Sequence, residues 1–156
     1  VGMALASKMD GKSWKTFVLM GDGEQGEGSI YEAAMAGNQY HLDNLVAIID
    51  RNRLQISGDT EDVMAIGCIR EKWTAFGWDV LEMDGDNVDD IVRTLDSVDY
   101  TLGKPHLVIS NTTKGLGVSY MENVAKWHHG VPSAEQYEVA IRDIEKRIEM
   151  VKEGVL

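Results

Sequence analysis

The stretch KTFVLMGDG, residues 15–23, decides how this chain folds. Its first six residues are β-prone and mostly apolar over the length of a strand, and the glycines that follow end the run. A second apolar run, LVAIID at residues 45–50, is typical of a strand covered on both faces in a parallel sheet. Because residues 29–40 between them carry small and apolar side chains at helical spacing, the segment predicts a strand–helix–strand unit.

The same alternation continues along the chain. We expect further strands over residues 78–82 and 106–110, and helices over residues 1–9, 63–76, 87–100 and 134–152. Ser133 is the expected N-cap of the last helix, with Gln136 completing a capping box. Strands that alternate with helices predict an α/β fold with a doubly wound parallel sheet, in a single domain over residues 1–156. The start within a helix indicates that an upstream segment of a longer polypeptide is missing.

Composition excludes several classes of protein. The chain has 156 residues and a hydrophobic content of 44%, which is enough for a core and argues against disorder. Its 15 Lys and Arg against 26 Asp and Glu give a net charge of −11, which argues against a nucleic-acid or anionic-membrane partner. The one cysteine, Cys68, cannot form an internal disulfide, and this fits a cytoplasmic location.

Polar residues stand where two of the expected strands end. Gly21, Asp22 and Gly23 close the first strand, and Asn52 follows the second by two residues. If these strands are neighbours, a carboxylate and an amide oxygen meet at the edge of the sheet where ligands bind in such folds. Two hard oxygen ligands suit Mg²⁺, and the glycines let backbone N–H groups approach a phosphate. The pattern therefore predicts a site for a metal and a phosphate group.

These residues also carry a family resemblance. The segments GDGEQGEG (21–28) and DRNRLQISG (50–58) resemble the thiamine diphosphate motif in the form found in transketolases. Further similar motifs follow in the same order along the chain: KW (72–73), FGW (76–78), TKGLG (113–117), YMEN (120–123) and WHH (127–129). The resemblance covers nearly the whole chain and is to the amino-terminal, diphosphate-binding part of transketolase, including versions split into two subunits.

The resemblance implies a role for each matching residue. Asp22, Asn52 and the main-chain carbonyl of Leu54 match the ligands of Mg²⁺, for which Ca²⁺ or Mn²⁺ can substitute. Thiamine diphosphate is the implied cofactor. Its binding residues would be Gly21, Asp22, Gly23, Asn52, Ile56 and His128, with Gly23 on the diphosphate and Ile56 near the thiazolium ring.

Two further roles concern catalysis. Glu27 matches an acidic residue linked to the catalytic glutamate of the other half-site. A histidine of the WHH segment matches one that lies between cofactor and substrate. His128 follows the Trp as in split forms and His129 precedes Gly130 as in full-length forms, so both stay candidates, with His128 slightly ahead.

The implied reaction transfers a two-carbon ketol unit from a ketose phosphate to an aldose phosphate. The implied partner is a carboxy-terminal subunit or domain with the pyrimidine-binding site, which we expect this chain to lack, in a dimer or heterotetramer. We therefore expect the chain alone to be inactive. The alternatives are a deoxyxylulose-phosphate synthase, the first component of a 2-oxo-acid dehydrogenase, or a non-catalytic truncated module. Arg53 departs from the family pattern by placing a cation beside the expected metal, so we expect its side chain to point away.

Overall fold

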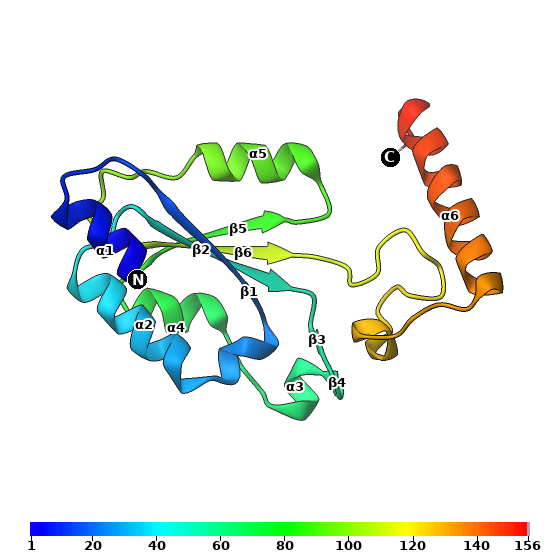
Figure 1. Cartoon of the computed structure of the whole chain (residues 1–156), viewed down its shortest axis with the longest axis horizontal. Helices are drawn as coiled ribbons and strands as arrows, with labels where there is room; N and C mark the ends of the chain where they lie inside the picture. Colours follow the sequence, from blue (N-terminus) through cyan, green and yellow to red (C-terminus); the bar gives the residue numbers. More distant parts are fainter. Residues whose placement is uncertain (156) are drawn as a thin grey trace.

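The computed structural model describes residues 1–155 and contains one main sheet with helices on both faces (Figure 1). Four parallel strands form this sheet in the order β1-β2-β6-β5. Their bounds are β1 Thr16–Gly21, β2 Leu45–Arg51, β5 Asp79–Asp84 and β6 His106–Asn111. The two apolar runs predicted as strands are therefore direct neighbours, and Gly21 is in register with Asp50. The predicted α/β fold with a parallel sheet is confirmed.

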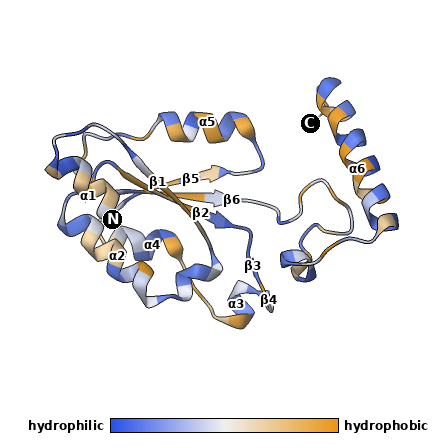
Figure 2. Cartoon of the chain, in the orientation of Figure 1, coloured by the Kyte–Doolittle hydropathy of each residue, from blue (hydrophilic) through white to orange (hydrophobic). Residues whose placement is uncertain are grey.

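Helices pack on both faces because side chains alternate along the central strands. Ala47 and Ile49 of β2 face a core that also contains side chains from α1 (Gly2–Met9), α2 (Gly28–Gln39) and α4 (Ile69–Ala75). Val46 and Ile48, which alternate with them, pack in a second core beneath α5 (Val88–Asp96). Figure 2 shows apolar stretches along the strands and a mixture of apolar and polar residues on the surrounding helices.

The helix predicted over residues 63–76 is wrong as a single element. A short helix, α3 (Thr60–Val63), ends at Val63, and α4 begins only at Ile69. Gly67 between them has a positive φ of 58°, and Cys68 has an extended conformation as the N-cap of α4. A left-handed residue followed by an extended one interrupts a helix, so the apolar spacing across the break was misleading.

The helix predicted over residues 87–100 is also shorter than expected, since α5 ends at Asp96. The hydroxyl of Ser97 donates to the carbonyl of Thr94, and the Asp99 carboxylate accepts from the backbone and the side chain of Thr101. Such local bonds favour a turn over further helix. The two bonds from Thr101 also hold the pKa of Asp99 below its ordinary value, with the Thr101 hydroxyl as the main cause.

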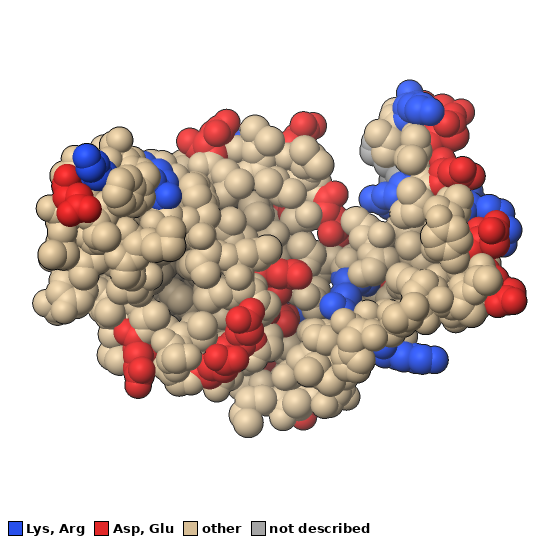
Figure 3. Space-filling model, in the orientation of Figure 1, with Lys and Arg blue, Asp and Glu red and all other residues tan. Residues whose placement is uncertain are grey.

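The carboxy-terminal part extends away from the sheet (Figure 1). It contains the short 3₁₀ helix η2 (Ala125–His128) and α6 (Ala134–Lys152), and α6 has the predicted capping box between Ser133 and Gln136. Both acidic and basic side chains cover α6, whereas acidic ones predominate on the visible face of the sheet body (Figure 3). None of the helices in the described part of the chain has the length and apolar character needed to cross a bilayer.

Candidate functional site

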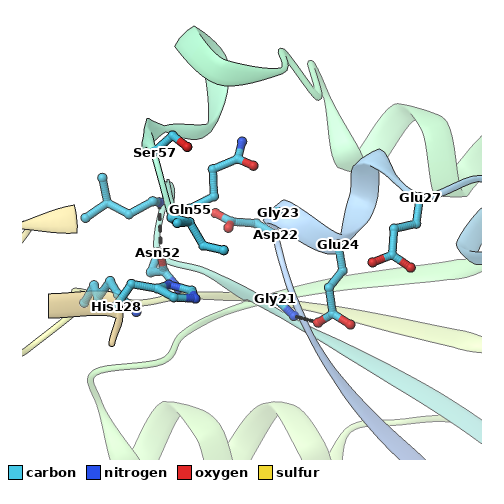
Figure 4. A pocket seen from close by; sticks show the side chains of 12 residues that line it. Gly21, Asp22, Gly23, Glu24, Glu27, Asn52, Gln55, Ser57 and His128 are labelled. Atoms are coloured by element: carbon cyan, nitrogen blue, oxygen red, sulfur yellow. Dashed lines mark hydrogen bonds between the residues drawn. The ribbon is translucent and has the colours of Figure 1, made fainter. Parts of the chain in front are cut away.

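An open cavity of about 550 Å³ lies at the carboxyl ends of β1 and β2 (Figure 4). The loop after β1 reaches it through the 3₁₀ helix η1 (Gly23–Gly26), and the loop after β2 through the short antiparallel pair β3 (Leu54–Gln55) and β4 (Gly58–Asp59). The lining residues are Gly21, Asp22, Gly23, Glu24, Glu27, Asn52, Leu54, Gln55, Ile56, Ser57, Lys114 and His128.

Asp22 is the most buried charged group of this cavity, with 1% of its surface exposed. Its Oδ2 atom accepts from the backbone N–H of Arg53 at 2.6 Å and from Nη1 of Arg51 at 2.9 Å. Its Oδ1 atom is buried and has no hydrogen-bond partner within the described chain. A buried carboxylate oxygen without a partner is costly, so Oδ1 is an acceptor to which a cation can bind.

Asn52 lies beside Asp22, because β1 and β2 are paired and end at the same edge of the sheet. Its amide is buried, and Oδ1 accepts from the backbone N–H of Leu54 at 3.0 Å. An amide oxygen has two lone pairs, so this bond leaves Asn52 one acceptor position. In Figure 4 the Asp22 carboxylate points from the end of β1 toward the segment that carries Asn52 and Gln55.

A buried glutamine anchors the loop after β1 to the helices that pack beside it. Gln25 is almost fully buried, its Oε1 accepts from the indole N–H of Trp73 at 3.2 Å, and its carbonyl accepts from the Tyr31 hydroxyl at 2.6 Å. A Cβ at Gly23 would lie 3.1 Å from Cβ of Gln55, which is a tighter contact than most side chains make. The two site loops therefore approach each other closely, and the loop after β1 is held to α4 and α2 through Trp73 and Tyr31.

The charges around the cavity are mainly negative. Asp22, Glu24 and Glu27 line it together with one lysine, Lys114. The Glu24 carboxylate also accepts from the backbone N–H of Gly21. Within residues 1–155 no group of three or more His, Cys, Asp or Glu side chains could hold a metal. A cation bound here would thus need amide or carbonyl oxygens in addition to Asp22, and those that suit Mg²⁺ are present in Asn52 and the adjoining backbone.

The remaining predicted site residues divide into two groups. Ile56, Glu27 and His128 line the cavity, and the Ile56 side chain is 64% exposed there. His129 is not among the lining residues, although its ring centroid is 5.7 Å from that of His128. The structure thus brings His128, and not His129, to the cavity, while the role of either histidine stays a prediction.

Sequence reasoning missed Arg51, whereas the exposed side chain of Arg53 agrees with the expectation that it points away. Arg53 has an exposed side chain and contributes its backbone N–H, whereas Arg51 forms the ion pair with Asp22. The available signal was the position of Arg51 as the last residue of β2, at the edge of the sheet where the site was expected. Lys114, on the loop after β6, also lines the cavity.

Residues 6–148 match the family model described as transketolase, thiamine diphosphate binding domain. One similar relative is a subunit of the apulose-4-phosphate transketolase of Phocaeicola vulgatus, which is 72% identical over 97% of this chain; the match covers 54% of that protein. The subunit of the same name from Actinobacillus succinogenes is 46% identical over 92% of this chain and 52% of its own length. The chain therefore spans about half the length of these relatives.

Solved structures agree with this comparison at the level of the fold. A transketolase from Campylobacter jejuni aligns with a TM-score of 0.73 at 24% identity, covering 96% of this chain and 28% of that one. Because the family model matches most of its length, the chain belongs to the family of transketolase thiamine diphosphate-binding domains.

Proposed function

We propose that this chain is the part of a transketolase that binds thiamine diphosphate and Mg²⁺. The observation that carries the proposal is the pair formed by Asp22 and Asn52, which are buried at the ends of adjacent parallel strands and line one cavity. The unpartnered Oδ1 of Asp22 fits a divalent cation. The Asn52 amide oxygen and the Leu54 carbonyl complete the set of protein oxygens that would hold it.

The metal is needed because of the charges in the cavity. A diphosphate carries roughly three negative charges, and it meets three carboxylates and only one lysine among the lining residues. A divalent cation held by Asp22 and Asn52 would make anion binding favourable there. Backbone N–H groups at Gly21 and Gly23 would donate to phosphate oxygens, and this requires the Glu24 carboxylate to release the N–H of Gly21.

When bound, the cofactor would supply the electron sink for breaking and forming a carbon–carbon bond. The chain's own residues would position it and manage protons. Ile56 would pack against the thiazolium ring, and Glu27 would hydrogen-bond to the glutamate of the second half-site. His128, exposed at the rim of the cavity, would donate a hydrogen bond or transfer a proton to substrate oxygens, and His129 remains the second candidate.

The proposed reaction moves a two-carbon ketol unit from a ketose phosphate to an aldose phosphate. The name of the relative that is 72% identical makes apulose 4-phosphate the first sugar phosphate to test. Xylulose and ribose phosphates are the second pair, and pyruvate tests the alternative thiamine enzymes.

The proposal also includes a partner subunit. The relatives are named as subunits of a transketolase, which implies a second subunit in those enzymes. In this chain β1 is an edge strand on which Phe17 and Leu19 are 55% and 71% exposed. Exposed apolar side chains on an edge strand are typical of a surface that another element covers. A carboxy-terminal subunit with the pyrimidine-binding site would complete the enzyme, as a dimer or heterotetramer.

Calorimetric titration of thiamine diphosphate into the chain with Mg²⁺ present tests the proposal. Asp22→Ala should abolish binding, and the nearly isosteric Asp22→Asn should weaken it strongly, because an amide cannot neutralise the cation. Asp96→Ala, which removes an exposed carboxylate from the end of α5, is the matched control and should leave the affinity unchanged. Unchanged affinity in a folded Asp22→Asn variant would refute the assignment of the metal ligand.

A further inference from the structure

Arg51 connects the cavity to the short helix α3 through its guanidinium group. The Nη1 atom donates to Oδ2 of Asp22 at 2.9 Å and to the hydroxyl of Thr60 at 2.7 Å, and Nη2 donates to Oε1 of Glu61 at 2.9 Å. Glu61 in turn accepts from the backbone N–H of Gly67 at 3.3 Å. One side chain therefore joins the loop after β1 to α3 and to the loop that follows it.

The environment of Arg51 makes these contacts rigid. Its side chain is 13% exposed and that of Asp22 is 1% exposed, so the pair is shielded from water. Thr60 is fully buried. A planar guanidinium with several fixed donors can serve acceptors in different directions at once, which a lysine ammonium on a flexible stem does poorly.

The two oxygens of Asp22 consequently have different surroundings. Arg51 and the Arg53 backbone occupy Oδ2, and Oδ1 is left buried without a partner among the described residues. A carboxylate held by one oxygen cannot rotate freely, so the other oxygen keeps a fixed direction. Hydrogen bonds of this kind to a ligating carboxylate orient it and change metal affinity by about 10–100-fold.

We propose that Arg51 is a positioning residue for the divalent cation, holding Asp22 through Oδ2 so that Oδ1 is presented to the metal. This inference rests on the proposed function of the cavity. It assigns Arg51 no contact with the metal, the cofactor or the substrate. It also makes α3 part of the metal site's support, since Thr60 and Glu61 fix the guanidinium from the opposite side.

The test is the Mg²⁺ affinity of the full chain, measured by calorimetry at saturating thiamine diphosphate, for wild type, Arg51→Met and Arg51→Lys. We expect Arg51→Met to bind Mg²⁺ about 10–100-fold more weakly. Arg51→Lys keeps the charge but loses the planar guanidinium with its several fixed donors. Its Mg²⁺ affinity should therefore lie between those of wild type and Arg51→Met. Arg93→Met removes an exposed arginine that pairs with Asp90 on α5, and it should match wild type.

Each other result overturns the inference. Affinity within about twofold of wild type in both Arg51 variants would show that the ion pair only supports the fold. Tighter binding in Arg51→Met would show that Arg51 competes with the metal. If Arg51→Met does not fold, the decision rests on Arg51→Lys, with urea unfolding as the check on its stability. Absence of Mg²⁺-dependent binding in wild type, measured with the partner subunit present, would instead refute the proposed function itself.

Discussion

Replacing Trp73 with Phe tests how the site loop is supported. The change removes the indole N–H that donates to Oε1 of Gln25 at 3.2 Å, and both side chains are about 2% exposed. Because Nε2 of Gln25 already lacks a partner in the described chain, the variant would leave its whole amide buried and unpaired. An acceptor orphaned in this way costs about 1–3 kcal/mol, and the smaller ring adds about 1 kcal/mol.

The expected loss of about 2–4 kcal/mol corresponds to a fall in Tm of about 4–16 °C for a domain of this size. Urea unfolding followed by circular dichroism measures the free energy of unfolding directly. Trp14→Phe is the matched control, because Trp14 is 45% exposed and its bond to the Met3 carbonyl is on the surface. That control should change stability by no more than about 0.5 kcal/mol.

The same substitution made in a Gln25→Leu variant separates the free energy lost with the hydrogen bond from that lost with the side-chain volume. In a Gln25→Leu chain the indole N–H of Trp73 has already lost its acceptor, so Trp73→Phe should cost no more than the volume term of about 1 kcal/mol, because it also removes a buried unpaired donor. If Trp73→Phe costs the same with Gln25 as with Leu at this position, the hydrogen bond does not support the loop and the reasoning is refuted.

Three further predictions concern catalysis, pH and the metal. In the enzyme reconstituted with its partner, His128→Ala should lower kcat/KM more than His129→Ala, because only His128 lines the cavity; equal effects would contradict this placement. The hydroxyl and then the backbone N–H of Ser119 hold the pKa of Asp143 below its ordinary value of 3.8, so the stability gained is present above pH 3.8 and is lost as the pH falls through the lowered pKa. Ser119→Ala should therefore raise the pKa of Asp143 in an NMR titration, and an unchanged value would disprove the contact. Thiamine diphosphate at about 100 times its Kd with Mg²⁺ should stabilise the chain by about 2.7 kcal/mol, and EDTA should remove that gain; stabilisation that survives EDTA would argue against a metal-dependent site.

Local signals account for the parts of the fold that were predicted. The capping box at Ser133 and Gln136 marks the start of α6 because both hydrogen bonds form within four residues. The long apolar run of β2 predicts a strand with two buried faces, and β2 does lie inside the sheet between β1 and β6. The prediction that Asp22 and Asn52 lie at the same edge of the sheet followed from the assumption that β1 and β2 are neighbours.

Long-range contacts explain what the sequence could not show. The insertion of β6 between β2 and β5 depends on packing between segments far apart in the chain, for example Ile49 opposite Ile109. The break between α3 and α4 depends on the backbone of Gly67, which interrupts apolar spacing that otherwise suits one helix. The contact between Arg51 and Asp22 joins residues 29 positions apart and gives no periodic signal.

The most direct measurement is a crystal structure of the chain with Mn²⁺ and thiamine diphosphate, with the manganese located by its anomalous scattering. Our account predicts one strong peak bonded to Oδ1 of Asp22 and Oδ1 of Asn52, with the diphosphate on the same ion. A peak elsewhere, or a diphosphate bound with no metal between it and Asp22, would contradict the account.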